Sequence, residues 1–254
     1  MSLGTPPPAT APRGGNHRLA LAGLLVGIAA LAALAAAGLG YRLGWWPLGT
    51  AFVLAQVGAY GAVLACALSA AGLVLALRRR AGRGIVLGLL GLAAALVVLV
   101  PAAQWKYAAS VSPPINDIAT DLEDPPLFQA MPRPGAYPGG DTATQQQAAY
   151  PDLQPLSLDL APERAFALAR TLVEDRGWAI VAAEPGEGHI EAVATTLLYG
   201  FEDEVVIRVA PTETGAVVDL RSRSRIGRGD LGTNAARIRS FLDDLREHAE
   251  GEGP

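Results

Sequence analysis

The stretch GIVLGLLGLAAALVVLVPAAQW, residues 84–105, runs for 22 residues without an Asp, Glu, Lys, Arg or His. A helix needs about 20 apolar residues to cross the hydrocarbon core of a bilayer, so this stretch is long enough. Two other uncharged stretches precede it, at residues 19–41 and 43–77. Helices buried in a soluble bundle would carry polar faces, and none is visible here. The sequence therefore predicts a membrane region at residues 19–107 with three helices, at about 19–41, 48–77 and 84–105.

Charges divide the chain into two parts. Residues 1–116 hold eight Lys and Arg and no acidic residue, whereas residues 117–254 hold all 24 Asp and Glu against twelve Arg. One globular domain would not be expected to sort its charges so completely, so we interpret the parts as regions in different solvents. The chain is 51% hydrophobic and 17% charged, with one cysteine and a net charge of −4. These values exclude a disordered protein, a disulfide-framed secreted domain and a nucleic-acid binder that works through overall charge.

Basic residues predict how the three helices cross the membrane. Arg13 and Arg18 precede the first helix, Arg42 follows it, and a dense cluster separates the second from the third: Arg78, Arg79, Arg80 and Arg83. Positively charged loops stay in the cytoplasm. We therefore expect an inner (plasma) membrane protein with a cytoplasmic tail at residues 1–18 and everything after Lys106 outside. Alternatively, the apolar run ending at residues 35–37 is a cleaved signal peptide, which would leave the C-terminal part on the same side.

The predicted spans contain no Asp, Glu, Lys, Arg or His, which favours an anchor over an ion or proton pathway. Gly23 and Gly27 form a GxxxG motif, and so do Gly84 and Gly88. Such motifs let helix backbones approach closely, but chance in a Gly- and Ala-rich chain explains them equally well. Cys66, the only cysteine, is interpreted as a small packing residue.

The sequence pattern of the C-terminal part predicts a small α+β domain at residues 153–248. Residues 108–152 are rich in Pro and Gly and read as a tether of extended chain or loop. Beyond them, apolar periodicity predicts strands and helices in the order β-α-β-β-β-β-α, at residues 156–160, 162–176, 178–183, 190–198, 204–210 and 216–226, with a closing helix from 230. The short connections predict an antiparallel sheet with both helices on one face.

An acidic group lies in the tether, at Asp117, Asp121, Glu123 and Asp124. Clustered carboxylates can bind hard cations, but the spacing is not that of an EF-hand loop and the run contains no glycine. We therefore predict no metal site and no cofactor. A solvated tether is one interpretation. Another is an arm laid along the folded domain, in which Asn116, Asp117 and Asp121 contact its arginines.

A stripe of arginines ends the last predicted strand. Arg221, Arg223 and Arg225 share one strand face, and Arg228 follows between Gly227 and Gly229. The run GRGDLG spells GxGxxG, but no parallel strand follows its helix, so a dinucleotide fold is excluded. A glycine-rich turn, a helix N-terminus and four arginines favour an anion or a lipid headgroup. Internal pairing with the acidic arm, with Asp219, Glu191 or Asp230, or plain solvent exposure, are the alternatives.

Several blocks of this part resemble a known family. Residues 115–121 with Asp124-Pro125-Pro126 are similar to the opening signature of the bacterial DUF1499 family, and residues 190–201 and 221–232 are similar to its later blocks. The resemblance covers about residues 112–247. It implies an envelope-associated α+β domain, often behind an N-terminal membrane segment, and it supplies no reaction and no catalytic residue.

The sequence predicts no catalytic residue of its own. The three histidines are scattered, no Cys/His set fits zinc, and no GxSxG motif is present. The main hypothesis is a non-catalytic, membrane-anchored periplasmic domain whose partners are the lipid bilayer and an envelope protein or anionic lipid, with no nucleic acid. The alternative is a periplasmic hydrolase that uses Asp117 or Asp121.

Overall fold

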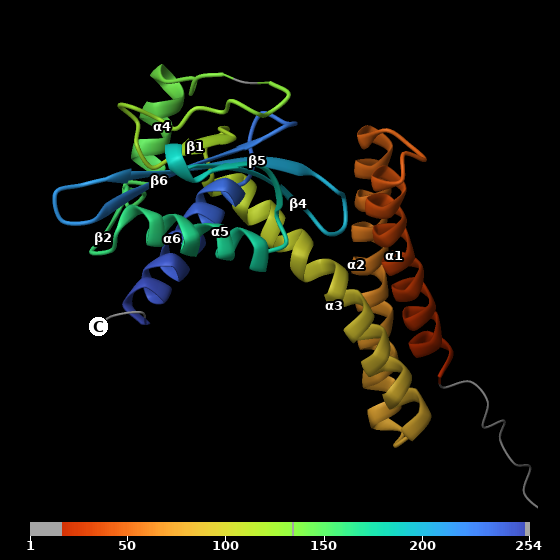
Figure 1. The fold of residues 1–254 in the computed structure, drawn as a ribbon. Coiled ribbons are helices and arrows are strands. Elements are labelled where there is room, and N and C mark those ends of the chain that lie inside the picture. The colour runs from red at the N-terminus through yellow and green to blue at the C-terminus, as the bar shows by residue number, and fades with distance from the viewer. Residues whose placement is uncertain (1–16, 134, 252–254) are drawn as a thin grey trace, which may run out of the picture. The chain divides into compact units, whose positions relative to one another are not determined.

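The computed structural model describes residues 17–133 and 135–251 (Figure 1). The chain divides into two compact units, Met1–Gln104 and Trp105–Pro254. Arg13 and almost all of the predicted cytoplasmic tail lie outside the described residues.

The first unit consists of three long helices: α1 (Arg18–Arg42), α2 (Leu48–Arg78) and α3 (Gly82–Val111), the last of which continues into the second unit. Each is long and apolar enough to cross a membrane, which confirms the three predicted spans. Pro47 caps the start of α2 in an extended conformation, as expected for a residue without a backbone N–H. Pro101 does not end α3, which continues past the predicted end at 105.

Glycines lie where these helices meet. A Cβ on Gly27 would lie 3.1 Å from the Cβ of Ala94, and one on Gly88 would lie 2.9 Å from the Cβ of Leu73. Ser69 is fully buried, and side chains added at Gly23 or Gly91 would collide with it. The glycines of both GxxxG motifs are buried, so packing between helices of this chain explains them better than chance does.

An antiparallel sheet forms the centre of the second unit. Its strands follow the order β1-β6-β5-β4-β3, and β2 pairs with the first half of β6. The strands are β1 (Asp117–Ala119), β2 (Leu156–Leu158), β3 (Ala179–Glu184), β4 (His189–Thr195), β5 (Glu202–Pro211) and β6 (Ala216–Ser224). A short 3-10 helix, η1 (Pro185–Glu187), lies between β3 and β4. These strands confirm the predicted antiparallel α+β domain.

Two amphipathic helices cover one face of the sheet, α5 (Pro162–Asp175) and α6 (Thr233–Gly251). Phe166 and Val173 of α5, and Ile238 and Phe241 of α6, pack in one apolar core with alternate strand residues such as Ile207. Trp178 stacks on Phe241 with ring centroids 5.6 Å apart. The helices therefore bury the apolar face of the sheet, as the strand periodicity predicts.

The prediction of extended chain or loop at residues 108–152 is wrong in three places, the first being residues 108–111, which belong to α3. Asp117–Ala119 forms β1 and pairs with β6, and Gly140–Ala149 forms a helix, α4. The folded domain therefore begins near residue 117 instead of 153. In Figure 1, α4 and the chain that leads to it lie on the side of the sheet opposite to α5 and α6.

Candidate functional site

Charged residues line the face of the sheet that α5 and α6 leave uncovered. They alternate with core residues along three strands and are mostly buried: Glu191, Glu204, Arg208, Asp219, Arg221 and Arg223. Residues 120–137, called the arm below, cover them; of these, residue 134 is outside the described residues. Phe128 and Met131 of the arm pack on Val193 and Val206 of the sheet. The polar face is therefore an interior layer between sheet and arm.

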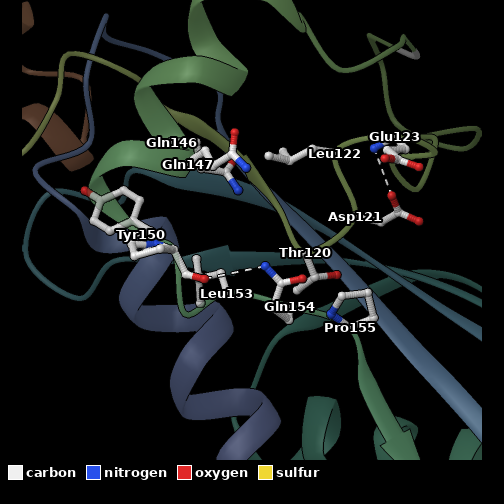
Figure 2. A pocket seen from close by; sticks show the side chains of 11 residues that line it. Thr120, Asp121, Leu122, Glu123, Gln146, Gln147, Tyr150, Leu153, Gln154 and Pro155 are labelled. Carbon is white, nitrogen blue, oxygen red and sulfur yellow. Dashed lines mark hydrogen bonds between the residues drawn. The ribbon is translucent and has the colours of Figure 1, made fainter.

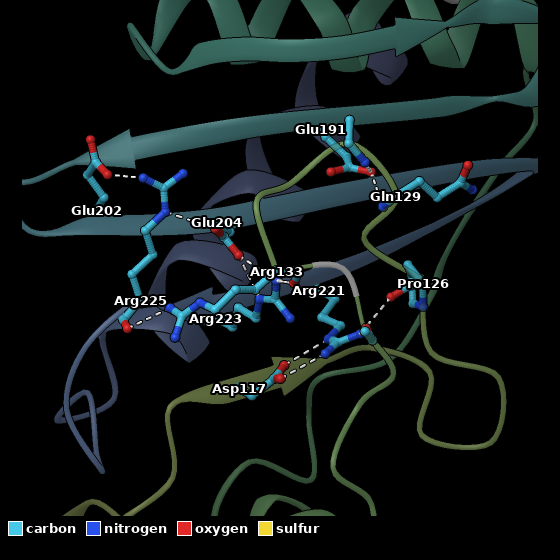
Figure 3. Close-up of polar contacts among 12 residues, drawn as sticks. Asp117, Pro126, Gln129, Arg133, Glu191, Glu202, Glu204, Arg221, Arg223 and Arg225 are labelled. Carbon is cyan, nitrogen blue, oxygen red and sulfur yellow. Dashed lines mark hydrogen bonds and ion pairs between the residues drawn. The ribbon is translucent and has the colours of Figure 1, made fainter.

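Arg221 is the centre of this layer and is fully buried. Its Nε and Nη2 donate to the two carboxylate oxygens of Asp117, each at 2.8 Å, and Nη1 donates to the carbonyls of Pro126 and Gly135, each at 3.1 Å (Figure 3). The ring of Phe128 lies 4.9 Å from the guanidinium carbon. A planar fork bound at two points is the strongest kind of Arg–carboxylate contact. Arg221 therefore joins β1, β6 and two separate points of the arm.

The other arginines of the stripe bind acidic residues of β5. Arg223 donates to Glu204 Oε2 at 2.7 Å, and Arg225 donates to Glu204 Oε1 at 2.8 Å and also pairs with Glu202. Glu204 is 1% exposed, so both its oxygens are used inside the domain. Arg223 also donates to the carbonyl of Arg133. The internal partners of the stripe are thus Asp117, Glu202 and Glu204. Asp117 belongs to the acidic group that the sequence suggested, whereas Asp219, Glu191 and Asp230 bind other groups.

A second buried acid, Glu191, fixes the middle of the arm. Its Oε1 accepts hydrogen bonds from the backbone N–H groups of Gln129 and Ala130 and lies 2.8 Å from Nε2 of His189. Burial acts to raise the pKa of Glu191, but the hydrogen bond from His189 and those from the arm outweigh it, and the net shift is downward. Glu191 is therefore an ionised anchor for the arm.

Asp121 and Asp124 of the arm bind Arg208 of β5. Arg208 Nη1 lies 2.7 Å from Asp124 Oδ2, and its Nη2 lies 3.4 Å from Asp121 Oδ2 and 2.9 Å from Asp219 Oδ2. Asp121 Oδ1 accepts the backbone N–H groups of Glu123 and Asp124, each at 2.9 Å. Burial raises the pKa of Asp219, and the nearby Arg208 offsets only part of that shift. Asp121 is therefore engaged by Arg208, away from the stripe.

Gln146 of α4 pairs with the backbone of β1. Its Oε1 accepts the N–H of Ala119 at 3.1 Å, and its Nε2 donates to the carbonyl of Ala119 at 2.6 Å. The hydroxyl of Tyr137 donates to the same Oε1 at 3.0 Å. Burial, reinforced by the negative charge of Asp117, raises the pKa of Tyr137 to about 12. The Gln146 side chain thus replaces a neighbouring strand and closes this edge of β1.

The glycine-rich loop 225–230 lies against the chain that leaves α3. The Asn116 side chain donates to the carbonyl of Gly227 at 2.7 Å, and a Cβ on Gly229 would lie 3.2 Å from Cα of Pro114. Asp230 accepts the N–H groups of Gly232 at 2.9 Å and Asn234 at 2.7 Å. Burial raises the pKa of Asp230 against these bonds. Asp230 therefore fills the anion position at the start of α6, while Arg228 is exposed beside it.

Two cavities open beside the arm. The larger, about 300 Å³, lies between the start of the arm and the end of α4 and includes Asp121, Glu123 and Gln147 in its lining (Figure 2). The smaller, about 190 Å³, includes His189 and Arg208. Within residues 17–133 and 135–251 no three His, Cys, Asp or Glu side chains converge on a point that could hold a metal ion. Both cavities lie at the rim of the layer and have a mixed polar and apolar lining.

The structure thus separates the predicted site residues. Arg221, Arg223 and Arg225 bind carboxylates within the domain, whereas Arg228 remains exposed in its loop. Asn116 and Asp117 contact the folded domain at Gly227 and Arg221. Residues that sequence reasoning missed include Glu204 and Gln146. Glu204 lies in the run Glu202-Asp203-Glu204 at the start of its strand, and its partners depend on cross-strand register, which the sequence does not reveal.

The folded domain coincides with a known sequence family. A family model described as "Protein of unknown function (DUF1499)" matches residues 117–245, from the first residue of β1 to the last turns of α6. This match covers more than half of the chain and confirms the resemblance noted from the sequence blocks. No curated protein matches the chain. The chain therefore belongs to the DUF1499 family.

Proposed function

We propose that the protein is a membrane-anchored domain on the outer side of the plasma membrane that binds phosphate-bearing anions, chiefly lipid headgroups, at the loop 225–230. One observation carries the proposal: this loop packs on residues 114–116, which follow the last turn of α3. The Asp230 N–H also donates to the carbonyl of Ile115 at 3.2 Å. Arg228 is therefore held close to the point where the chain leaves the membrane.

The position of α3 supports contact with headgroups. Trp105, Lys106 and Tyr107 lie in its last two turns, as expected of an interfacial anchor. A helix rises about 1.5 Å per residue, so the end of α3 at Val111 lies about 9 Å beyond Trp105. Val111 is then about one Debye length from the headgroups, and the loop contacts Pro114, three residues further along the chain. An arginine close to an anionic surface contributes about 1 kcal/mol to binding it.

The arrangement of charges supports Arg228 as the contact residue. Arg221 is buried, and Arg223 and Arg225 hold Glu204, so binding an anion through these three would require breaking internal ion pairs. Arg228 is the exposed member of the set and is flanked by Gly227 and Gly229, which leave its backbone accessible. A guanidinium binds phosphate oxygens at two points, which suits a headgroup phosphate or a free phosphate.

The orientation rests on the distribution of basic residues. Arg78, Arg79, Arg80 and Arg83 lie between α2 and α3, and the positive-inside tendency puts this turn in the cytoplasm. The C-terminal domain is then periplasmic, in the cell envelope.

The geometry gives little support to a hydrolase that uses Asp117 or Asp121. Asp117 has both oxygens on Arg221, and Asp121 accepts two backbone N–H groups while it binds Arg208. Asp121 does line a cavity together with Glu123. However, a general acid or base must offer an oxygen to its substrate, and the oxygens of Asp121 already have partners.

The test uses the full-length protein purified in detergent and examined by native mass spectrometry. We expect wild-type protein to retain phosphatidylglycerol in preference to phosphatidylcholine, and Arg228→Gln to lose this preference. Arg170→Gln is the matched control, since Arg170 is an exposed arginine on α5 whose partner is Glu174. Retention of phosphatidylglycerol by Arg228→Gln would contradict the proposal. Binding of inorganic phosphate by wild type, with no lipid preference, would point to a free phosphate as the ligand.

A further inference from the structure

The most exposed large apolar side chain of the second unit, Leu197, lies at one end of its sheet. β4 ends, β5 begins and β6 ends here, because Thr195 pairs with Glu202 and Asp203 pairs with Ser224. The chain from α3 enters the sheet at the same end, where Asp117 pairs with Arg223. The loop 196–201, the loop 225–230 and the chain that follows α3 therefore all lie at this end of the sheet.

The loop 196–201 has the sequence TLLYGF and contains no charged residue. Leu197 at its tip is 87% exposed, the largest exposed fraction of any large apolar side chain in the described residues. Tyr199 and Phe201 stack behind it with ring centroids 5.1 Å apart. A leucine at the tip with aromatic rings behind it is the composition of a segment that lies in the membrane interface.

Other exposed apolar residues lie in the loop 225–230 and on the last turns of α3. Ile226 in the adjacent loop is 43% exposed, and Trp105, Tyr107 and Val111 on α3 are each at least 59% exposed. The loop at the opposite end of the sheet, residues 212–215, reads TETG and is polar. Leu127 and Val181 are exposed elsewhere in the unit, but of the two loops at opposite ends of β5 only the one nearer the chain from α3 is apolar. This contrast favours the bilayer as the surface that covers Leu197.

We propose that the β4–β5 loop is a second membrane contact, in which Leu197 and Leu198 insert into the interfacial layer of the bilayer that α3 crosses. Only five residues, 112–116, separate α3 from β1, so the domain cannot move far from the membrane surface. Insertion of the loop would hold this end of the sheet against the lipid. The inference depends on the proposed membrane anchorage and not on anion binding by Arg228.

The experiment measures the depth of single labels in neutral phosphatidylcholine vesicles. Cys66→Ala removes the native thiol, and Leu197→Cys then carries an environment-sensitive fluorophore that lipid-attached nitroxides quench on contact. Thr214→Cys is the matched control: it is an exposed hairpin residue at the far end of β5, about 30 Å away at the rise of a strand. Tyr107→Cys reports the anchorage itself.

We expect nitroxides near the headgroup to quench labels at 197 and 107 several-fold more than the label at 214. Quenching at 107 without quenching at 197 would overturn the loop contact and leave the anchorage intact. No quenching at either position would overturn both. Equal quenching at 197 and 214 would also overturn the inference, since the domain would then lie flat on the bilayer. Because the vesicles carry no net charge, a failure of anion binding at Arg228 would leave the expected result unchanged.

Discussion

Asp117 and Arg221, 104 residues apart in the chain, meet in a two-point ion pair whose N–O distances are both 2.8 Å. The pair lies between the sheet and the arm, where Arg221 has no exposed surface. A buried ion pair contributes little net stability compared with apolar residues of the same volume, but loss of one partner leaves a buried charge. The pair thus joins β1 to β6 and orients Arg221, whose remaining N–H groups hold the arm through the carbonyls of Pro126 and Gly135.

Asp117→Asn should destabilise the domain strongly. The buried guanidinium of Arg221 would lose its compensating charge, so the free energy of unfolding should fall by about 3–5 kcal/mol. Chemical denaturation of the full-length protein in micelles, followed by far-UV circular dichroism, measures the change. Arg170→Met serves as a control, because it breaks an exposed pair with Glu174 and should cost less than about 0.5 kcal/mol. Equal effects of the two substitutions would refute the structural role of the pair.

Glu191 should make stability depend on acidic pH. Its folded pKa is lowered from the ordinary value of 4.5, so below that value the unfolded chain binds more protons than the folded chain. The contribution of Glu191 is present above pH 4.5 and is lost as the pH falls through the folded pKa. Asp219 and Asp230 have raised pKa values and act in the opposite sense, so the contribution of Glu191 must be taken from a difference between variants.

We therefore expect wild type to exceed Glu191→Gln in free energy of unfolding by roughly 1–3 kcal/mol at neutral pH. The difference should shrink as the pH is lowered from 5 to 3. Glu213→Gln, at an exposed position in the β5–β6 loop, should follow the wild-type curve throughout. A gap that stays constant over this range would show that the Glu191 charge does not hold the arm.

Gln146→Ala should open the edge of β1. The substitution leaves the N–H and carbonyl of Ala119 without the two hydrogen bonds that Gln146 makes, at a cost of about 1–3 kcal/mol for each buried group left unsatisfied. Amide hydrogen exchange at Ala119 should accelerate in the variant. Gln147→Ala changes an exposed neighbour on the same helix and should leave exchange at Ala119 unaltered. Unchanged protection in Gln146→Ala would mean that water or the arm replaces the side chain.

Gly72→Ala should loosen the membrane helices. A Cβ at this position would lie 2.7 Å from Cα of Ala20, and since that atom is backbone, no rotation of a side chain can relieve the clash. Overpacking of this kind costs about 1–3 kcal/mol. Gly49→Ala lies on the same helix with nothing within 4 Å of the added atom. Thermal unfolding in micelles should show a lower midpoint for Gly72→Ala alone; identical midpoints would contradict the close approach of α1 and α2.

Apolar pattern made most of the fold predictable from the sequence. The three spans and the strands from residue 178 onward follow directly from runs and alternation of apolar residues. β1 and α4 escaped prediction because their stability does not come from such a pattern. Asp117–Ala119 has only three residues and is ordered by pairing with β6. The segment TATQQQAA has no apolar stripe, and its one buried residue, Gln146, binds a strand instead of a core.

The sequence was enough to predict which face of the strand the arginines share, but not which carboxylates they bind. Period two put Arg221, Arg223 and Arg225 on one face of a strand, and β6 bears this out. Which carboxylates they bind depends on the register of β5 against β6, where Glu204 lies opposite Arg223. Register is set by long-range packing, so single-strand periodicity could not distinguish internal pairing from a binding surface.

The central claim, a domain held on the outer side of the membrane by three spans, is tested most directly by a reporter fusion in living cells. Alkaline phosphatase, which is active only outside the cytoplasm, should be active when fused after Gly251 and inactive when fused after Arg80, between α2 and α3. A fluorescent protein that folds only in the cytoplasm should give the reverse result at both positions. Phosphatase activity after Arg80 together with fluorescence after Gly251 would contradict the account.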